Sequence, residues 1–277
     1  MRGRFGIIGL RALPHGWRDV VRQVALFLAA YLLYQLIRGL IDGGSVYKPF
    51  GDATKIIHFE RLLHVFAEPS VQAWTASTRW LMDFADWTYL NAHYVVTLGA
   101  LVFIYLRRND SFYFVRNMFM VAMAIALVGY AIYPTAPPRL MPEWGFTDSI
   151  SQFTGTITDH GPTKPFLNFY AAVPSMHVCF AVMVGWPMAR LVDHWPARIA
   201  WGLYPLLITF VVVATGNHYF TDVLLGGLTA CASALLAGRL LARARPDAST
   251  FGHAREPSRS RAPGEPARPR DSAPATA

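Results

Sequence analysis

The sequence has little charge and almost no cysteine. Asp, Glu, Lys and Arg make up only 15% of its 277 residues, whereas hydrophobic residues make up 53%, and the mean hydropathy is +0.29. The two cysteines, Cys179 and Cys231, both lie inside apolar stretches. This excludes a disulfide framework or a cysteine metal cluster and predicts buried, inert thiols. So low a charge content is typical of a chain whose solvent is largely hydrocarbon.

Six apolar runs are long enough to cross a bilayer, which takes about 20 helical residues. They cover residues 20–41, 87–106, 114–133, 173–192, 197–215 and 220–240. The first run is too long for the apolar region of a cleaved signal peptide, and no small-residue cleavage site follows it, so we expect it to be retained. The sequence therefore predicts an all-α polytopic membrane protein. A basic N-terminus (1–19) precedes a bundle of six transmembrane helices (20–241), and a disordered tail (242–277) follows.

The basic excess, a formal net charge of +8, follows the predicted topology. Of the 25 basic residues, 18 fall on one side of six crossings: Arg2, Arg4, Arg11, Arg18, Arg22, Arg107, Arg108, Arg116, Arg190, Arg198 and the eight from Arg239 onward. By the positive-inside rule this side is the cytoplasm, so both termini are predicted to be cytoplasmic. This distribution argues against a nucleic-acid-binding surface.

Two segments then lie on the outer side. Residues 42–86 contain Phe59, Leu62, Leu63 and Phe66 at helical spacing, which predicts an interfacial amphipathic helix. Its charges are expected to be solvated or structural: Glu60, Arg61 and Glu68. Residues 134–172 lack a periodic pattern, and a loop of this length is often functional. Three prolines in "PTAPPRL" stiffen the chain before Arg139, which suits a mount for an anion-binding cation or an arginine bonded to headgroups or loop carbonyls.

The stretch "VPSMH" predicts the start of a helix entering the bilayer from outside. Ser175 is a candidate N-cap after Pro174. His177 then falls in the first turn, near unpaired amides and the positive end of the helix dipole, where anions bind.

A second histidine follows in "GNHYFTD", at the same predicted side. His218 and Asp222 are four residues apart and share a helix face, so the carboxylate can orient the imidazole. Such an imidazole suits a nucleophile or general base, a second imidazole suits a general acid, and arginine stabilises phosphate oxygens. We therefore expect His218, Asp222, His177 and Arg139 to meet and to perform phosphoryl transfer.

Two alternatives use the same residues. Two histidines and a carboxylate could form a facial triad for iron or zinc, but Arg139 would oppose a cation and no further ligand is evident. A transporter could use them as a proton relay, but it would need ionisable groups at mid-membrane depth and inverted repeats, which the sequence does not show.

The motifs resemble the signatures of the type 2 phosphatidic acid phosphatase superfamily, which are Lys-x6-Arg-Pro, Pro-Ser-Gly-His and Ser-Arg-x5-His-x3-Asp. "PSMH" matches the second with Met176 in the glycine position, "HYFTD" supplies His-x3-Asp, and "PPRL" supplies the first arginine. The departures are Ile132 for the lysine, Leu140 for the proline, and Val211 and Val212 for Ser-Arg. The combination is more similar to the branch of fungal inositol phosphorylceramide synthase and related inositolphosphotransferases.

The resemblance implies that His218 attacks phosphorus and that Asp222 orients it. It further implies that His177 protonates the leaving oxygen and that Arg139 and Ser175 bind phosphate, with no metal or other cofactor. The implied partners are a lipid phosphate or phosphodiester substrate and membrane lipids, and the sequence specifies no oligomeric state. Without the usual lysine and second arginine, the pocket is less cationic. This suits a phosphodiester donor and a transferase, unless a residue such as Lys164 restores the charge.

Overall fold

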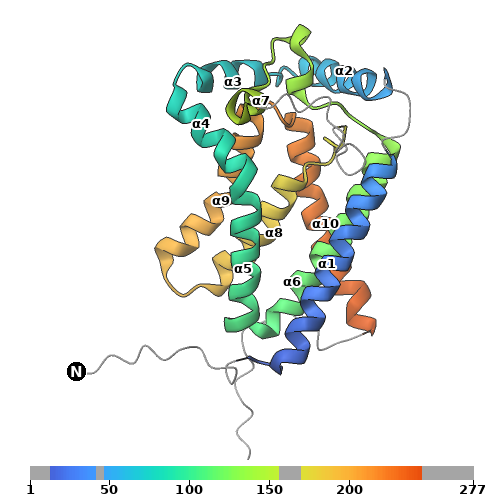
Figure 1. The fold of residues 1–277 in the computed structure, drawn as a ribbon, viewed down its shortest axis with the longest axis vertical. Helices are drawn as coiled ribbons and strands as arrows, with labels where there is room; N and C mark the ends of the chain where they lie inside the picture. The colour runs from blue at the N-terminus through green and yellow to red at the C-terminus, as the bar shows by residue number, and fades with distance from the viewer. Residues whose placement is uncertain (1–12, 42–46, 156–169, 245–277) are drawn as a thin grey trace, which may run out of the picture.

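The computed structural model describes residues 13–41, 47–155 and 170–244 (Figure 1). Within them the chain is helical. The α-helices are α1 (Gly16–Ile41), α2 (Tyr47–Leu62), α3 (Glu68–Ala76), α4 (Arg79–Trp87), α5 (His93–Arg107), α6 (Asn109–Ile132), α7 (Ser149–Thr154), α8 (Met176–Leu191), α9 (Trp195–Ala214) and α10 (Phe220–Ala244). A π-helical turn, η2 (Thr88–Ala92), joins α4 to α5, and two 3-10 turns, η3 (Pro138–Leu140) and η4 (Pro142–Trp144), precede α7.

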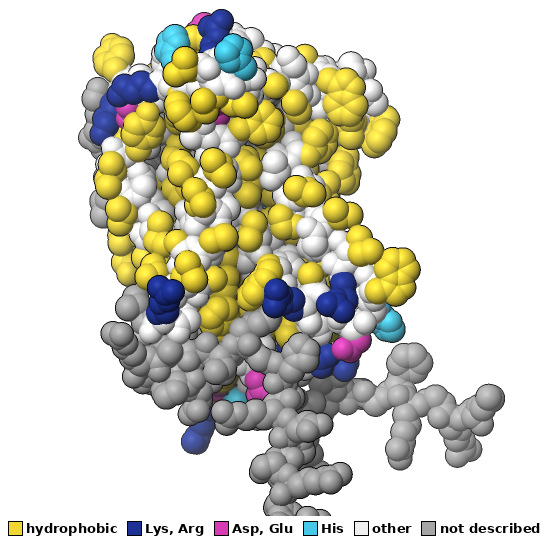
Figure 2. Space-filling model, turned by 180° about the vertical axis from the view of Figure 1, so that it is seen from behind, with side chains coloured by type: hydrophobic (Ala, Val, Ile, Leu, Met, Phe, Trp, Pro, Cys, Tyr) yellow, Lys and Arg dark blue, Asp and Glu magenta, His cyan; other side chains and the backbone are white. Residues whose placement is uncertain are grey.

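Five helical stretches in the described part of the chain are long and apolar enough to cross a membrane. They are Gly16–Gly39, Arg79–Arg107, Asn109–Ile132, Trp195–Ala214 and Phe220–Arg239. In Figure 2 hydrophobic side chains cover the middle of the visible face, and charged side chains gather toward its two ends. The all-helical fold and its membrane character are therefore as the sequence predicts.

The sixth predicted span, at 173–192, corresponds to the shorter helix α8. Its 16 residues extend about 24 Å, less than the roughly 30 Å of a bilayer core. α8 contacts α5, α6, α9 and α10, so protein surrounds much of it. Gly185 permits the close approach of α9, because a Cβ there would lie 2.7 Å from the Trp201 carbonyl oxygen. The described residues therefore contain five helices long enough to cross a membrane, and the sixth predicted span stays a prediction.

Among the described residues, one end of the bundle carries arginines that the topology prediction grouped, such as Arg108. Arg108, between α5 and α6, donates to the Leu191 carbonyl oxygen and pairs with Asp193 at 3.1 Å. At the start of α1, Asp19 accepts hydrogen bonds from the hydroxyls of Tyr105 and Tyr113. Through these contacts the α5–α6 turn touches both the start of α1 and the α8–α9 turn.

The opposite end is covered by α2 and α3, which lie across the bundle, and by the short helix α7, while α4 slopes down from this end into α5 (Figure 1). The predicted amphipathic face is split: Phe59, Leu62 and Leu63 are exposed, whereas Phe66 packs edge-on against Trp144 and Phe146. The buried face of α2 instead carries Ala53, Ile56 and Ile57 among its apolar residues. Residues 141–146 cover this face of α2, a contact that no local sequence pattern predicts.

Several local predictions need correction. Cys179 is buried and Cys231 is exposed on α10, so the buried thiol predicted at Cys231 is wrong; both thiols are free. The predicted loop at 134–172 contains η3, η4 and α7 in its described part. α10 continues to Ala244, past the predicted helix end. Lys164 and residues 245–277 lie outside the described residues.

Candidate active site

The turn between α9 and α10 carries His218. Gly216 turns the chain at a φ of 65°, and the amides of Asn217 and His218 both donate to the Val212 carbonyl oxygen. His218 Nδ1 lies 3.4 Å from Asp222 Oδ2, which also accepts from the Tyr219 amide at 3.1 Å. The carboxylate fixes both the ring and the turn, so Nε2 is the ring nitrogen directed away from Asp222. His218 is 5% exposed.

The start of α8 lies against the start of α10. Ser175 is the N-cap of α8, as the sequence predicts: its hydroxyl accepts from the Val178 amide at 3.4 Å. Its own amide donates to the Asp222 carbonyl oxygen at 3.1 Å. The helices meet so closely at Gly226 that a Cβ there would collide with the Ser175 carbonyl oxygen. Because Ser175 is fully buried with these bonds, its observed role is to join the two helix starts, and its phosphate contact stays a prediction.

This junction brings the two histidines together. His177, in the first turn of α8, has its ring centroid 5.8 Å from that of His218. Two histidines on different helices can therefore face one reacting group, with one of them fixed by a carboxylate.

Arg139 reaches the same turn from η3. Its amide donates to the Gly216 carbonyl oxygen at 2.7 Å, and its Nε donates to Asn217 Oδ1 at 3.1 Å. One terminal nitrogen pairs with Asp148 Oδ2 at 3.1 Å. Asp148 also caps α7 through the Ser151 amide. The four predicted site residues are thus gathered at one end of the bundle, and Asp148 is a counter-ion that the sequence analysis missed.

Two aromatic rings that the sequence analysis missed surround His177. Tyr89, from η2, stacks on His177 at 4.4 Å between ring centroids, and His93, at the start of α5, lies at 4.5 Å. π-Helical turns occur often at functional sites, and here the turn carries Tyr89 and ends next to His93. The sequence did contain a signal for His93. It lies inside the predicted span 87–106, and ionisable residues inside membrane spans are rare unless they are functional.

A second cation approaches from α1. Tyr34 donates to the Tyr130 hydroxyl, which donates to the Pro174 carbonyl oxygen, so this part of α1 lies beside the "VPSMH" motif. Arg38 lies one helical turn beyond Tyr34, on the same face of α1, and its Nε atom is buried. The sequence analysis did not include Arg38 in the site.

Two buried glutamates complete the start of α10. Glu68 Oε1 accepts from the Phe220 amide at 3.0 Å, and Glu60 Oε1 accepts from the Thr221 amide at 2.7 Å. Burial and the neighbouring Glu68 raise the pKa of Glu60 to about 8. The prediction that these carboxylates are structural fits this arrangement, and the alternative that they are solvated is wrong.

The described residues offer no three His, Cys, Asp or Glu side chains placed to hold one metal ion. In particular, His218 Nδ1 faces Asp222, so this pair is arranged as a carboxylate-oriented imidazole. The facial-triad alternative has no support from this geometry.

A helical membrane bundle with two histidines, an oriented carboxylate and an arginine at one end has the groups that phosphoryl transfer requires. The chain belongs to the PAP2 superfamily, whose family model matches residues 54–236. This match includes every predicted site residue as well as Glu60 and Glu68, and Arg38 precedes it. No curated protein and no solved structure matched the chain. Membership of the superfamily supports a phosphatase-type activity on phosphoesters.

Proposed function

We propose that the protein is an integral-membrane lipid phosphatase or phosphotransferase that cleaves a lipid phosphoester through a phosphohistidine at His218. The observation that carries the proposal is that His218 is paired with Asp222 and lies close to His177. The centroids of the two histidine rings are 5.8 Å apart. An imidazole held by a carboxylate is a stronger nucleophile, and a second imidazole can manage the leaving group's proton.

The proposed reaction has two steps. His218 Nε2 attacks phosphorus while the bond from phosphorus to the leaving oxygen breaks, and His177 gives its proton to that oxygen. An acceptor hydroxyl then attacks the phosphohistidine and gives its proton to His177, and the P–N bond breaks to restore His218. Arg139 stabilises the charge on the phosphoryl oxygens in both steps. Ser175 sets the start of α8 and is a candidate for one further phosphate contact.

The acceptor is either water or the hydroxyl of a lipid or polyol. The resemblance to inositolphosphotransferases and the apolar Ile132 and Val212 at two usual cation positions favour a phosphodiester donor, which has one negative charge fewer than a monoester. We therefore propose headgroup transfer to a hydroxyl acceptor as the alternative to hydrolysis.

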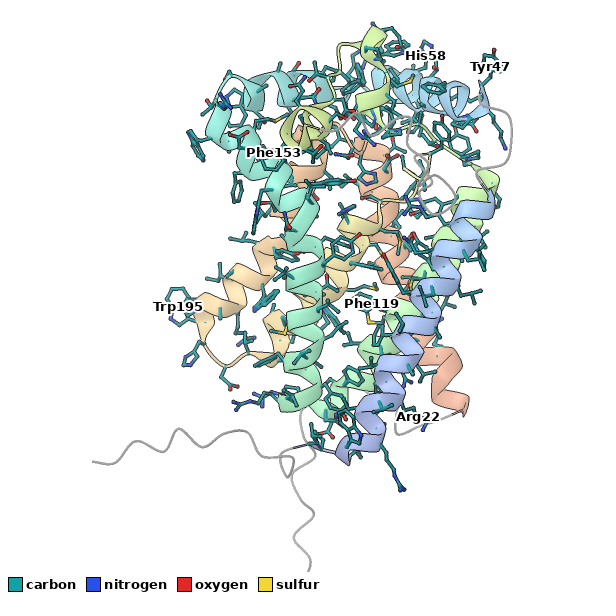
Figure 3. All side chains as sticks on the ribbon, in the orientation of Figure 1. Arg22, Tyr47, His58, Phe119, Phe153 and Trp195 are labelled. Atoms are coloured by element: carbon teal, nitrogen blue, oxygen red, sulfur yellow. The ribbon has the colours of Figure 1, made fainter. Side chains whose placement is uncertain are left out.

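We propose that the site faces the outer leaflet of the cell membrane, with both termini cytoplasmic. Arg22 lies at the end of α1 far from His58 and Tyr47, which mark the covered end (Figure 3), and the cytoplasmic side is the one enriched in arginine. Exposed tryptophans occur toward both ends of the bundle, as at a membrane with two interfaces: Trp17, Trp74, Trp80, Trp87 and Trp195. In this arrangement α8 is the sixth crossing and α2 lies at the outer interface.

A product screen tests the proposed function. Purified protein is incubated with lipid phosphomonoesters and phosphodiesters, with and without chelator, and both inorganic phosphate and lipid products are measured. Free phosphate from a monoester identifies a phosphatase, and a new headgroup lipid without phosphate release identifies a transferase. Activity on neither class contradicts the proposal, and loss of activity on chelation contradicts the metal-independent mechanism.

Arg38 provides a separate test of the phosphate site. Arg38→Gln is expected to raise KM for the lipid phosphate by roughly 10-fold to 100-fold, because a hydrogen bond to a charged group contributes about 1.5–3 kcal/mol. Arg38→Lys should recover part of the loss. The matched control is Arg22→Gln, at the opposite, exposed end of the same helix (Figure 3). Equal KM values for Arg38→Gln, Arg22→Gln and the unchanged protein would remove Arg38 from the site.

A further inference from the structure

Three carboxylates bind three consecutive amides at the start of α10. Asp222 accepts from the amide of Tyr219, Glu68 from that of Phe220 and Glu60 from that of Thr221. The first amides of a helix have no partner within the helix, so such acceptors are expected there. However, one carboxylate suffices for a cap, and here the three come from α10 itself, α3 and α2.

The two glutamates lie close together inside the protein. Glu60 is 1% exposed and Glu68 is fully buried, and the amides that they bind are neighbours in the chain. Among the described residues, neither second carboxylate oxygen, Glu60 Oε2 or Glu68 Oε2, has a hydrogen-bond partner. Buried polar atoms are nearly always hydrogen-bonded. Each of these two oxygens therefore needs a hydrogen-bond donor that no described side chain supplies.

One proton would satisfy both of these oxygens. A protonated carboxyl group donates through one oxygen and still accepts through the other, so each glutamate keeps its helix amide while the two share a hydrogen bond. Two adjacent buried carboxylates cannot both ionise without strong repulsion. This is the arrangement of a carboxyl pair that titrates as a unit.

We propose that Glu60 and Glu68 are positioning residues for His218 that hold the start of α10 through one shared proton. Loss of this proton at alkaline pH separates the two carboxylates, loosens the Phe220 and Thr221 amides, and adds negative charge beside the phosphate site. The effect reaches His218 through Tyr219 and Asp222, which belong to the same turn. The positioning role rests on the proposed function of His218, whereas the shared proton does not.

The titratable groups around Glu60 agree with this assignment. Besides Glu68, they are Tyr219 and Asp222 from the start of α10, and His218 is bonded to Asp222. Glu143 from η4 faces Tyr219 and is itself exposed. Burial, followed by the effect of Glu68, raises the pKa of Glu60 from 4.5 to about 8. Glu60 therefore holds its proton at neutral pH and loses it in the mildly alkaline range.

This arrangement has a consequence for stability that needs no substrate. Between the ordinary pKa of 4.5 and the raised value of about 8, the native protein binds more protons than the unfolded chain. The free energy of unfolding must then decrease as pH rises through this window. Glu60→Gln removes the titrating group but keeps an oxygen for the Thr221 amide and adds an N–H donor for Glu68, so its stability should change less across the same window.

The experiment compares the full-length protein in detergent with Glu60→Gln, Glu68→Gln and Glu143→Gln. Glu143 is exposed at the same end of the bundle and serves as the control. Infrared spectra are recorded from pH 6 to 10, together with kcat and KM for the lipid phosphate that is turned over fastest in the product screen. A protonated carboxyl band should disappear near pH 8 in the unchanged protein and in Glu143→Gln, and no such change should occur in Glu60→Gln.

The activity results separate a positioning role from a purely structural one. In the unchanged protein KM should rise above a pH of about 8, and in Glu60→Gln this rise should move up by about one pH unit or more. Glu60→Ala, which removes the acceptor altogether, should lower kcat/KM by roughly 10-fold to 100-fold.

Two outcomes overturn the proposal. If no carboxyl band titrates in the unchanged protein, or if the titrating band is still present in both Glu60→Gln and Glu68→Gln, the shared proton does not exist. If the band behaves as expected but the pH dependence of KM is the same in Glu60→Gln, the pair does not position His218. Failure to find any substrate would contradict the proposed function alone, because the infrared titration and the stability curve still test the carboxyl pair.

Discussion

His218→Ala is expected to lower turnover by roughly 10³-fold to 10⁶-fold, the range seen when the attacking group of a catalytic unit is removed. His218 Nδ1 is held by Asp222 at 3.4 Å, which leaves Nε2 to attack, and no other described histidine is paired with a carboxylate in this way. The measurement is phosphate release or headgroup transfer by the purified variant, whichever the product screen has identified.

The matched control for this variant is His58→Ala. His58 is an exposed histidine of α2 at the same end of the bundle, where Figure 3 labels it near the top. Its removal should leave turnover unchanged. Elution volume and thermal unfolding in detergent must show that His218→Ala is folded. Near-normal turnover by folded His218→Ala would end the proposed mechanism.

His177→Ala is expected to lower turnover by roughly 10²-fold to 10⁴-fold, as for loss of a general acid. The loss should depend on the leaving group. A lipid alkoxide needs a proton from His177, whereas a nitrophenolate leaves without one. The variant should therefore be much less impaired on an aryl phosphate than on a lipid phosphate. Equal impairment on both substrates would show that His177 acts through binding or structure and does not donate a proton.

The predictions that succeeded depend on local sequence. Apolar runs specify helices α1, α6, α9 and α10 because a membrane helix satisfies its own backbone hydrogen bonds. Ser175 was identifiable as an N-cap because capping needs only a serine in front of a helix. His218 and Asp222 were identifiable as a pair from their spacing of four residues, although His218 lies in the turn before α10 and does not share a helix face with Asp222.

The features that were missed depend on contacts between distant segments. Glu60 and Glu68 read as ordinary helix charges, and only the fold shows that they bind amides more than 150 residues away. Arg38 was counted simply as part of an apolar span. Tyr89 and His93 approach His177 through a π-helical turn, for which the sequence has no periodic signal.

The meeting of the motifs was expected from topology alone, and the contacts that achieve it were not. Counting crossings placed "PPRL", "PSMH" and "HYFTD" on one side of the membrane. The atoms that join them are main-chain groups: the Arg139 amide on Gly216 and the Ser175 amide on Asp222. Main-chain hydrogen bonds between loops leave little trace in residue type. A sequence can therefore predict that such segments meet, but not which atoms join them.

Direct detection of the covalent intermediate tests the central claim most closely. The protein is mixed with a lipid labelled in its phosphate, quenched in alkali, in which phosphohistidine is stable, and digested for mass spectrometry. The account predicts label on the peptide that contains His218, with none in His218→Ala. Label on a different residue, or sustained turnover with no labelled histidine at any time, would contradict it.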